Sequence, residues 1–156
     1  MGFIKILLLK KVLNKNNAFT WDSSNKSLKS INKFKSINLD LLIGIEKQKK
    51  TILDNTKNFS KGNFTNNALL WGSRGNGKST LIKSVFLDLA SKNNNLKLIQ
   101  LNKEHIFDIE ILYEYLDKIS KLRFIIFIDD LSFEKIDSDY KIIKSTLDGS
   151  IQNQPT

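Results

Sequence analysis

The chain has 156 residues, of which 40% are hydrophobic and 26% are charged, which is enough apolar material for one packed domain. It contains no cysteine and one histidine, which excludes disulfides, thiolate metal sites, a cysteine nucleophile and a multi-histidine metal site. No apolar run approaches the ~20 residues of a membrane span, and no export signal is recognisable, so we expect a cytoplasmic protein without a transmembrane segment.

The net charge of +9 is unevenly distributed along the chain. Residues 1–61 hold 13 lysines against 4 acidic residues, whereas residues 62–156 hold 12 basic and 12 acidic residues. A basic arm of this kind can follow nucleic acid, because neutralising phosphates needs only positive charge. Alternatively, the surplus reflects composition alone, since 23 of the 25 basic residues are lysine in a chain rich in Asn and Ile. Both interpretations of residues 1–61 stay open.

The first 38 residues are interpreted as a basic N-terminal leader. Residues 3–13 predict a helix whose apolar side carries Phe3, Ile4, Leu7, Leu8 and Val12. Residues 14–38 are rich in Asn, Lys and Ser with isolated aromatic residues, which indicates a loosely ordered segment held in place by aromatic contacts. From Leu39 onward the apolar residues recur more regularly. Their helical spacing over 45–59 predicts a helix, and Gly62 ends that segment.

Strands and helices alternate in the rest of the chain. The predicted strands cover 68–71, 96–101 and 124–128, and the predicted helices cover 78–91, 109–119 with Asp108 as N-cap, and 138–149. This alternation predicts an α/β fold with a mainly parallel sheet. The apolar run 124–128 is typical of a strand that is buried on both sides.

Residues 72–79 read G-x-x-x-x-G-K-S and follow the first of these strands directly. In such a loop the glycines let backbone N–H groups turn toward phosphates, Lys78 reaches the β and γ oxygens, and the Ser79 hydroxyl ligates Mg²⁺. A glycine-rich surface turn is the alternative, but the strand before and the helix after it favour a phosphate loop. The expected ATP-binding residues here are Gly72, Ser73, Arg74, Gly75, Asn76, Gly77, Lys78, Ser79 and Thr80.

A second motif, the acidic pair Asp129-Asp130, follows the apolar strand 124–128. Ligands of open α/β sheets collect at the carboxyl ends of strands, so we expect Asp129 to hold Mg²⁺ beside the loop. We assign catalytic roles to Lys78 and to Asp130, which would orient or deprotonate the attacking water. A polar strand end that opens a turn is the alternative for both carboxylates.

The loop, the Asp129-Asp130 strand and the entry segment 42–46 resemble the AAA+ superfamily of ATPases. The resemblance implies that the entry segment lies against adenine, which adds Ile43 and Gly44 to the cofactor-binding candidates. More closely, the chain is similar to a bacterial family of predicted AAA+ ATPases with no assigned role. The similar motifs are 18–21, 41–49, 55–56, 66–75, 129–133 and 140–150.

This resemblance implies a P-loop NTPase fold, a three-layer sandwich in which residues 39–156 form a partial AAA+-like nucleotide-binding domain. Members of the family continue past the position of Pro155 into further core strands and a helical lid, so we expect a truncated core. The implied sheet order leaves a strand missing between 68–71 and 124–128. Either the sheet stays open there, or 68–71 closes directly on 124–128, and we expect marginal stability.

The expected function is ATP binding by an AAA+-type ATPase core with Mg²⁺. Hydrolysis would require the missing C-terminal elements or assembly into a homo-oligomer, because only Arg74 and Arg123 could serve as an arginine finger and neither fits clearly. In ATPases the residue in place of Asp130 is usually Glu. Two alternatives remain: a DNA-associated ATP switch or loader with a basic arm, and a P-loop kinase, which would need a substrate lid and further arginines.

Overall fold

The computed structural model describes residues 3–119 and 121–131. Four strands form one sheet in the order β2-β1-β3-β4; β1, β3 and β4 run parallel, and β2 is antiparallel to β1. The predicted class, α/β with a mainly parallel open sheet, is confirmed. The elements are α1 (Phe3–Lys15), β1 (Ala18–Asp22), β2 (Ser27–Ser30), η1 (Leu39–Leu41), α2 (Glu46–Ser60), α3 (Lys78–Ala90), β3 (Leu96–Leu101), η2 (Lys103–Asp108), α4 (Ile109–Asp117) and β4 (Arg123–Ile128).

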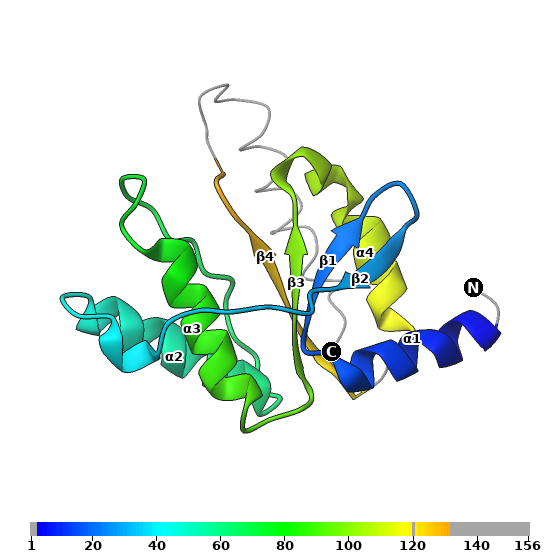
Figure 1. Cartoon of the computed structure of the whole chain (residues 1–156), viewed down its shortest axis with the longest axis horizontal. Coiled ribbons are helices and arrows are strands. Elements are labelled where there is room, and N and C mark those ends of the chain that lie inside the picture. The colour runs from blue at the N-terminus through cyan, green and yellow to red at the C-terminus, as the bar shows by residue number, and fades with distance from the viewer. Residues whose placement is uncertain (1–2, 120, 132–156) are drawn as a thin grey trace.

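Helices lie on both faces of the sheet, with α2 and α3 on one side and α1 and α4 on the other (Figure 1). Leu98 of β3 belongs to the core formed with α3, whereas the next residue, Ile99, belongs to the core formed with α4. Successive side chains of a strand point to opposite faces, so a strand that is buried on both faces holds two cores together. β3 is this central element.

The predicted helices and strands after residue 44 mostly match the structure. α2, α3, β3, α4 and β4 each begin and end within two residues of the predicted bounds. Gly62, with φ of 92°, adopts the left-handed conformation that lets the chain turn away after α2. The predicted helix 138–149 lies outside the described residues.

The predicted strand 68–71 is wrong. This segment has no strand pairing in the described part of the chain, and Trp71 is 89% exposed. The segment is held on the helical side instead, where Asn55 Nδ2 of α2 donates a hydrogen bond to the Asn66 carbonyl at 3.1 Å. Within the described residues β4 pairs only with β3, so the sheet stays open at the outer edge of β4.

The expected burial of β4 on both sides is also wrong. Phe127 is buried, while the other residues of the strand are half-buried. The reason is the open edge, because a strand without a neighbour on one side leaves its side chains partly uncovered.

The expectation that residues 14–38 are loosely ordered is corrected by two strands. β1 lies parallel to β3, with Phe19 opposite Ile99, and β2 folds back on β1 as a hairpin. Phe19 is 0% exposed and Trp21 is buried with it in the core against α4. These two aromatic residues alternate with Ala18 and Thr20, which is the period-two pattern of a strand.

The helix predicted over 3–13 is confirmed as α1, but Val12 of the predicted apolar side is not buried. Leu9 and Leu13 are buried, whereas Val12 is 36% exposed. The neighbouring connection is attached to the sheet by Lys97, whose buried Nζ donates to the Asn16 carbonyl at 3.1 Å and to Asn17 Oδ1 at 2.6 Å. Burial lowers the pKa of Lys97.

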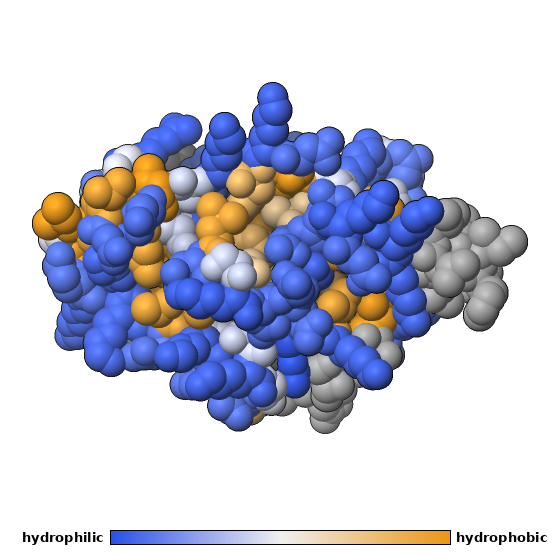
Figure 2. Space-filling view, turned by 60° about the horizontal axis from the view of Figure 1, so that its bottom comes forward, coloured by the Kyte–Doolittle hydropathy of each residue, from blue (hydrophilic) through white to orange (hydrophobic). Residues whose placement is uncertain are grey.

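The surface shown in Figure 2 is mostly hydrophilic, with apolar side chains gathered in separate patches. This pattern agrees with a highly charged chain that leaves some large apolar residues, such as Phe64 and Phe107, exposed. Within residues 3–119 and 121–131, every helix is too short or too polar to cross a bilayer.

Asp108 occupies the predicted N-cap position of α4, but its side chain makes no capping hydrogen bond. Instead, Asp108 Oδ2 accepts from Trp21 Nε1 at 2.9 Å and Oδ1 accepts from Lys26 Nζ at 2.7 Å. The Lys26 ammonium, with hydrogen bonds from Ser23 and Trp21, lowers the pKa of Asp108 to about 2. Asp108 therefore joins the β1–β2 hairpin to α4.

We expect the free energy of unfolding to fall as the pH is lowered from about 4 to about 2. A carboxyl group whose pKa is lowered on folding stabilises the protein above its unfolded pKa of about 3.9, and this contribution is lost as the pH falls through the folded value. Urea unfolding at a series of pH values should show a flatter acid limb for Asp108→Asn than for the wild type. The exposed Asp117 provides the control, Asp117→Asn; identical acid limbs in both variants would contradict the prediction.

Candidate functional site

The loop 72–79 connects the extended segment 65–71 to α3, and its glycines adopt conformations that other residues rarely take. Gly75 and Gly77 have φ of 84° and 72°. A Cβ atom at either position would meet nothing within 4 Å, so the requirement is conformational rather than one of space. Gly77 is the N-cap of α3 and offers no side-chain acceptor to the first turn. The N–H groups at the start of a helix have no acceptor within the helix, and such groups can bind an anion.

Lys78, the first residue of α3, folds back over this loop. Its Nζ donates hydrogen bonds to the carbonyl oxygens of Gly72, at 2.9 Å, and Ser73, at 2.8 Å. The ammonium group is thereby held in the concave side of the turn. A phosphate group that entered the loop would compete with these two carbonyls for the same donor.

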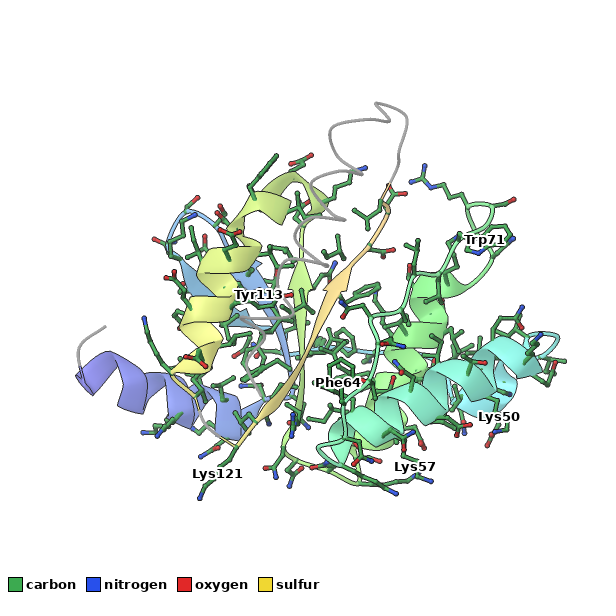
Figure 3. All side chains as sticks on the ribbon, turned by 180° about the vertical axis from the view of Figure 1, so that it is seen from behind. Lys50, Lys57, Phe64, Trp71, Tyr113 and Lys121 are labelled. Carbon is green, nitrogen blue, oxygen red and sulfur yellow. The ribbon has the colours of Figure 1, made fainter. Side chains whose placement is uncertain are left out.

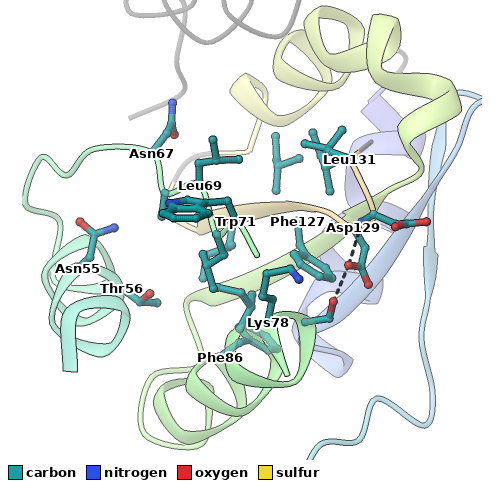
Figure 4. A pocket seen from close by; sticks show the side chains of 18 of the residues that line it. Asn55, Thr56, Asn67, Leu69, Trp71, Lys78, Phe86, Phe127, Asp129 and Leu131 are labelled. Carbon is teal, nitrogen blue, oxygen red and sulfur yellow. Dashed lines mark hydrogen bonds between the residues drawn. The ribbon is translucent and has the colours of Figure 1, made fainter. Parts of the chain in front are cut away.

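Ser79 and Asp129 are 50 residues apart in the sequence and meet at the carboxyl end of β4. Ser79 Oγ donates a hydrogen bond to Asp129 Oδ1 at 2.5 Å (Figure 4). The same Oδ1 accepts from the backbone N–H of Asp130 at 3.0 Å. Two donors thus fix the Asp129 carboxylate beside the first turn of α3, as the two sequence motifs together predict.

Asp130 lies at the exposed rim of this site. Its backbone is left-handed, with φ of 55°, a conformation that Asp tolerates better than most residues. Its Oδ2 lies 3.6 Å from Nζ of Lys103. Sequence reasoning missed Lys103, although its position shortly after β3 is the signal that could have indicated it, because the carboxyl ends of neighbouring parallel strands meet.

A cavity of about 1150 Å³ extends from the loop along the open edge of β4. It is bounded by β4, α3, α4, the residues Asn55, Thr56 and Phe59 of α2, and the segment 65–72. Figure 3 shows that segment, from Phe64 to Trp71, running between α2 and β4. At the far end, Arg123 Nη2 donates to the Gly62 carbonyl at 3.3 Å and its guanidinium lies over Phe59. Arg123 is thus remote from the loop.

The cavity brings most of the sequence candidates together. Among its lining residues are Gly72, Arg74, Gly75, Asn76, Gly77, Lys78, Ser79, Thr80, Asp129 and Asp130. Ser73 contributes its carbonyl oxygen to Lys78. The structure does not bring Ile43 and Gly44 to this cavity: Ile43 is 83% exposed, and the Gly44 N–H donates to Glu46 Oε1 at 2.9 Å.

The donor set fits a hard cation such as Mg²⁺. The hydroxyl of Ser79 and the carboxylate of Asp129 are oxygen ligands in direct contact, and Mg²⁺ commonly takes one or two protein oxygens and completes its shell with phosphates and water. Within the described residues, no group of three His, Cys, Asp or Glu side chains offers a fuller protein cage. The arrangement therefore suits a metal that arrives with a phosphate ligand.

Comparison with known proteins identifies a family for this chain. No curated protein and no solved structure matches the chain. One family model covers residues 14–156, a range that includes β1, the loop 72–79 and the Asp129-Asp130 motif. The chain therefore belongs to the family described as protein of unknown function (DUF815).

Proposed function

We propose that this chain is an ATP-binding protein built on an AAA+-type ATPase core. The observation that carries the proposal is the hydrogen bond between Ser79 and Asp129, because it joins the glycine-rich loop to the acidic end of a neighbouring strand. A glycine-rich surface turn without a binding function would not need an acidic residue beside its serine hydroxyl. Phosphate-binding loops of NTPases need this one, since their metal is shared between the loop hydroxyl and an acidic residue at a strand end.

Phosphate binding would use the backbone more than the side chains. The positive φ angles of Gly75 and Gly77 allow a turn whose N–H groups, with the positive end of α3, would bind a phosphate. Lys78 would exchange its bonds with the carbonyls of Gly72 and Ser73 for charge-assisted bonds to phosphate oxygens, which are stronger. In the structure Lys78 therefore already lies beside the place that a phosphate would occupy.

Mg²⁺ would be held by Ser79 and Asp129, and when bound it would neutralise charge on the phosphate oxygens. Asp130 would orient a water molecule at the exposed rim or accept a proton from it. Its carboxylate is one methylene shorter than a glutamate, a difference of roughly 1.5 Å that affects the positioning of a water molecule. Binding is therefore the primary activity that we assign, with hydrolysis depending on an arginine from a neighbouring subunit or another segment.

Asp129→Ala is expected to remove most of the Mg²⁺ dependence of ATP binding. Coupling between two ligands at one site typically amounts to about 5- to 150-fold in affinity, and it should fall to near unity once the shared carboxylate is lost. Titration of ATP with and without Mg²⁺ measures this ratio directly. Asp88→Ala, which removes a half-buried carboxylate of α3 that pairs with Lys92, is the matched control. An unchanged Mg²⁺ effect in Asp129→Ala would contradict the proposed site.

A further inference from the structure

We infer that Lys103 makes this site selective for nucleoside triphosphates over diphosphates, by binding the terminal phosphate. This inference rests on the proposed function and adds to it a residue outside both sequence motifs. It follows from the position of the lysine, from the weakness of its present ion pair, and from the charges that surround a bound nucleotide.

Lys103 is placed beside the site by the register of the sheet. β3 and β4 are parallel, and Leu101, the last residue of β3, lies opposite Ile128, the last residue of β4. The residues that follow each strand therefore emerge side by side. Asn102 accepts a hydrogen bond from the Glu104 N–H at 3.2 Å, which fixes the backbone on either side of Lys103 as η2 begins.

A short chain of contacts connects this lysine to the proposed metal site. The ammonium of Lys103 lies 3.6 Å from Asp130 Oδ2. The N–H of Asp130 donates to Asp129 Oδ1, which also accepts from the Ser79 hydroxyl. The ammonium of Lys103 thus stands one residue away from the carboxylate that would hold Mg²⁺.

The present pair between Lys103 and Asp130 is a weak one. At 3.6 Å it exceeds ordinary hydrogen-bond length, and the side chains of the lysine and the aspartate are 39% and 63% exposed. Exposed pairs of this kind contribute little to stability. Lys103 can therefore move to a phosphate oxygen at small cost, whereas a tightly bound lysine could not.

The charge at the site explains why such a cation is needed. Asp129 and Asp130 place two carboxylates together at this end of the cavity, and a triphosphate would add more negative charge beside them than a diphosphate. Lys78, which now contacts the loop carbonyls, would serve both nucleotides, because the β-phosphate within its reach is present in each. Lys83, the other nearby lysine of α3, has its ammonium 5.8 Å from the centre of the Phe127 ring. Arg74 also lines the cavity but belongs to the loop itself, whereas Lys103 approaches Asp130 from the end of β3.

The test compares the affinities of full-length variants for ATPγS and ADP in the presence of Mg²⁺, measured by calorimetry. Lys103→Met is expected to weaken ATPγS binding roughly tenfold while ADP binding changes by less than about twofold. Lys103→Arg keeps the charge and should stay close to the wild type. Lys92→Met removes an exposed, aspartate-paired lysine at the other end of α3 and should alter neither affinity.

Two outcomes would overturn the inference alone: an ATPγS to ADP affinity ratio that stays unchanged in Lys103→Met, or an equal loss for both nucleotides. The second result would mean that the lysine acts on the fold or on the general potential of the site. A wild-type chain that binds neither nucleotide would instead overturn the proposed function, and the inference with it. Failure of the two ideas is therefore distinguishable in one set of titrations.

Discussion

Lys78→Ala is expected to lower the affinity for Mg-ATP by about 100-fold or more. The side chain would make two charge-assisted hydrogen bonds to phosphate oxygens, each worth about 1.5 to 3 kcal/mol, and about 1.4 kcal/mol corresponds to a tenfold change. The fold should persist, because the Gly72 and Ser73 carbonyls that now accept from Lys78 lie in an exposed loop and can turn to water.

Trp71 offers a direct measurement of this change. It is exposed and precedes the loop immediately, whereas Trp21 is buried in the core, so nucleotide binding should alter the fluorescence of Trp71 selectively. Trp71→Phe identifies the source of the signal. Lys92→Ala, at the other end of α3, serves as the control and should bind like the wild type. Equal affinity of Lys78→Ala and the wild type would refute the assignment of the loop.

Phe19→Ala is expected to lower the free energy of unfolding by about 3 to 5 kcal/mol, a large part of the ~5 to 15 kcal/mol typical of a domain. Phe19 is fully buried in β1, opposite Ile99, and its loss would leave a cavity between the sheet and α4. Urea unfolding followed by circular dichroism measures the change. Phe64→Ala, at a highly exposed phenylalanine, should change stability by less than about 0.5 kcal/mol. A comparably small loss for Phe19→Ala would show that β1 is not part of the stable core.

Two short apolar segments show why only part of the fold could be predicted. Residues 68–71 are apolar throughout, whereas residues 18–22 include Thr20 and Asp22, so the local pattern favours a strand at 68–71 over one at 18–22. Only residues 18–22 pair with β3, and only they form a strand. A strand forms where a neighbour can accept its backbone hydrogen bonds, and that neighbour lies far away in sequence. The local pattern therefore predicted α3, β3 and α4 well, but it predicted a strand at 68–71 and missed the strand at 18–22.

The part of the candidate site that belongs to sequence motifs could be predicted, because the residue types and spacing of those motifs reflect their chemistry. Ser79 and Asp129 belong to motifs that predict a shared metal site, and the structure brings the two side chains into hydrogen-bond contact. Lys103 belongs to no motif, and its place depends on the register between β3 and β4, which no local pattern contains. Ile43 was predicted by resemblance alone, and its side chain lies away from the cavity, exposed to solvent.

The glycines of the loop have a consequence for stereochemistry. Because open space surrounds Gly75 and Gly77 and their φ angles are positive, an added methyl group is opposed by the handedness of the L-amino acid rather than by crowding. A D-alanine has the mirror-image preference and would adopt these angles without strain. Semisynthesis could therefore stiffen the turn that presents its N–H groups while leaving its shape intact, separating the effect of rigidity from the effect of size.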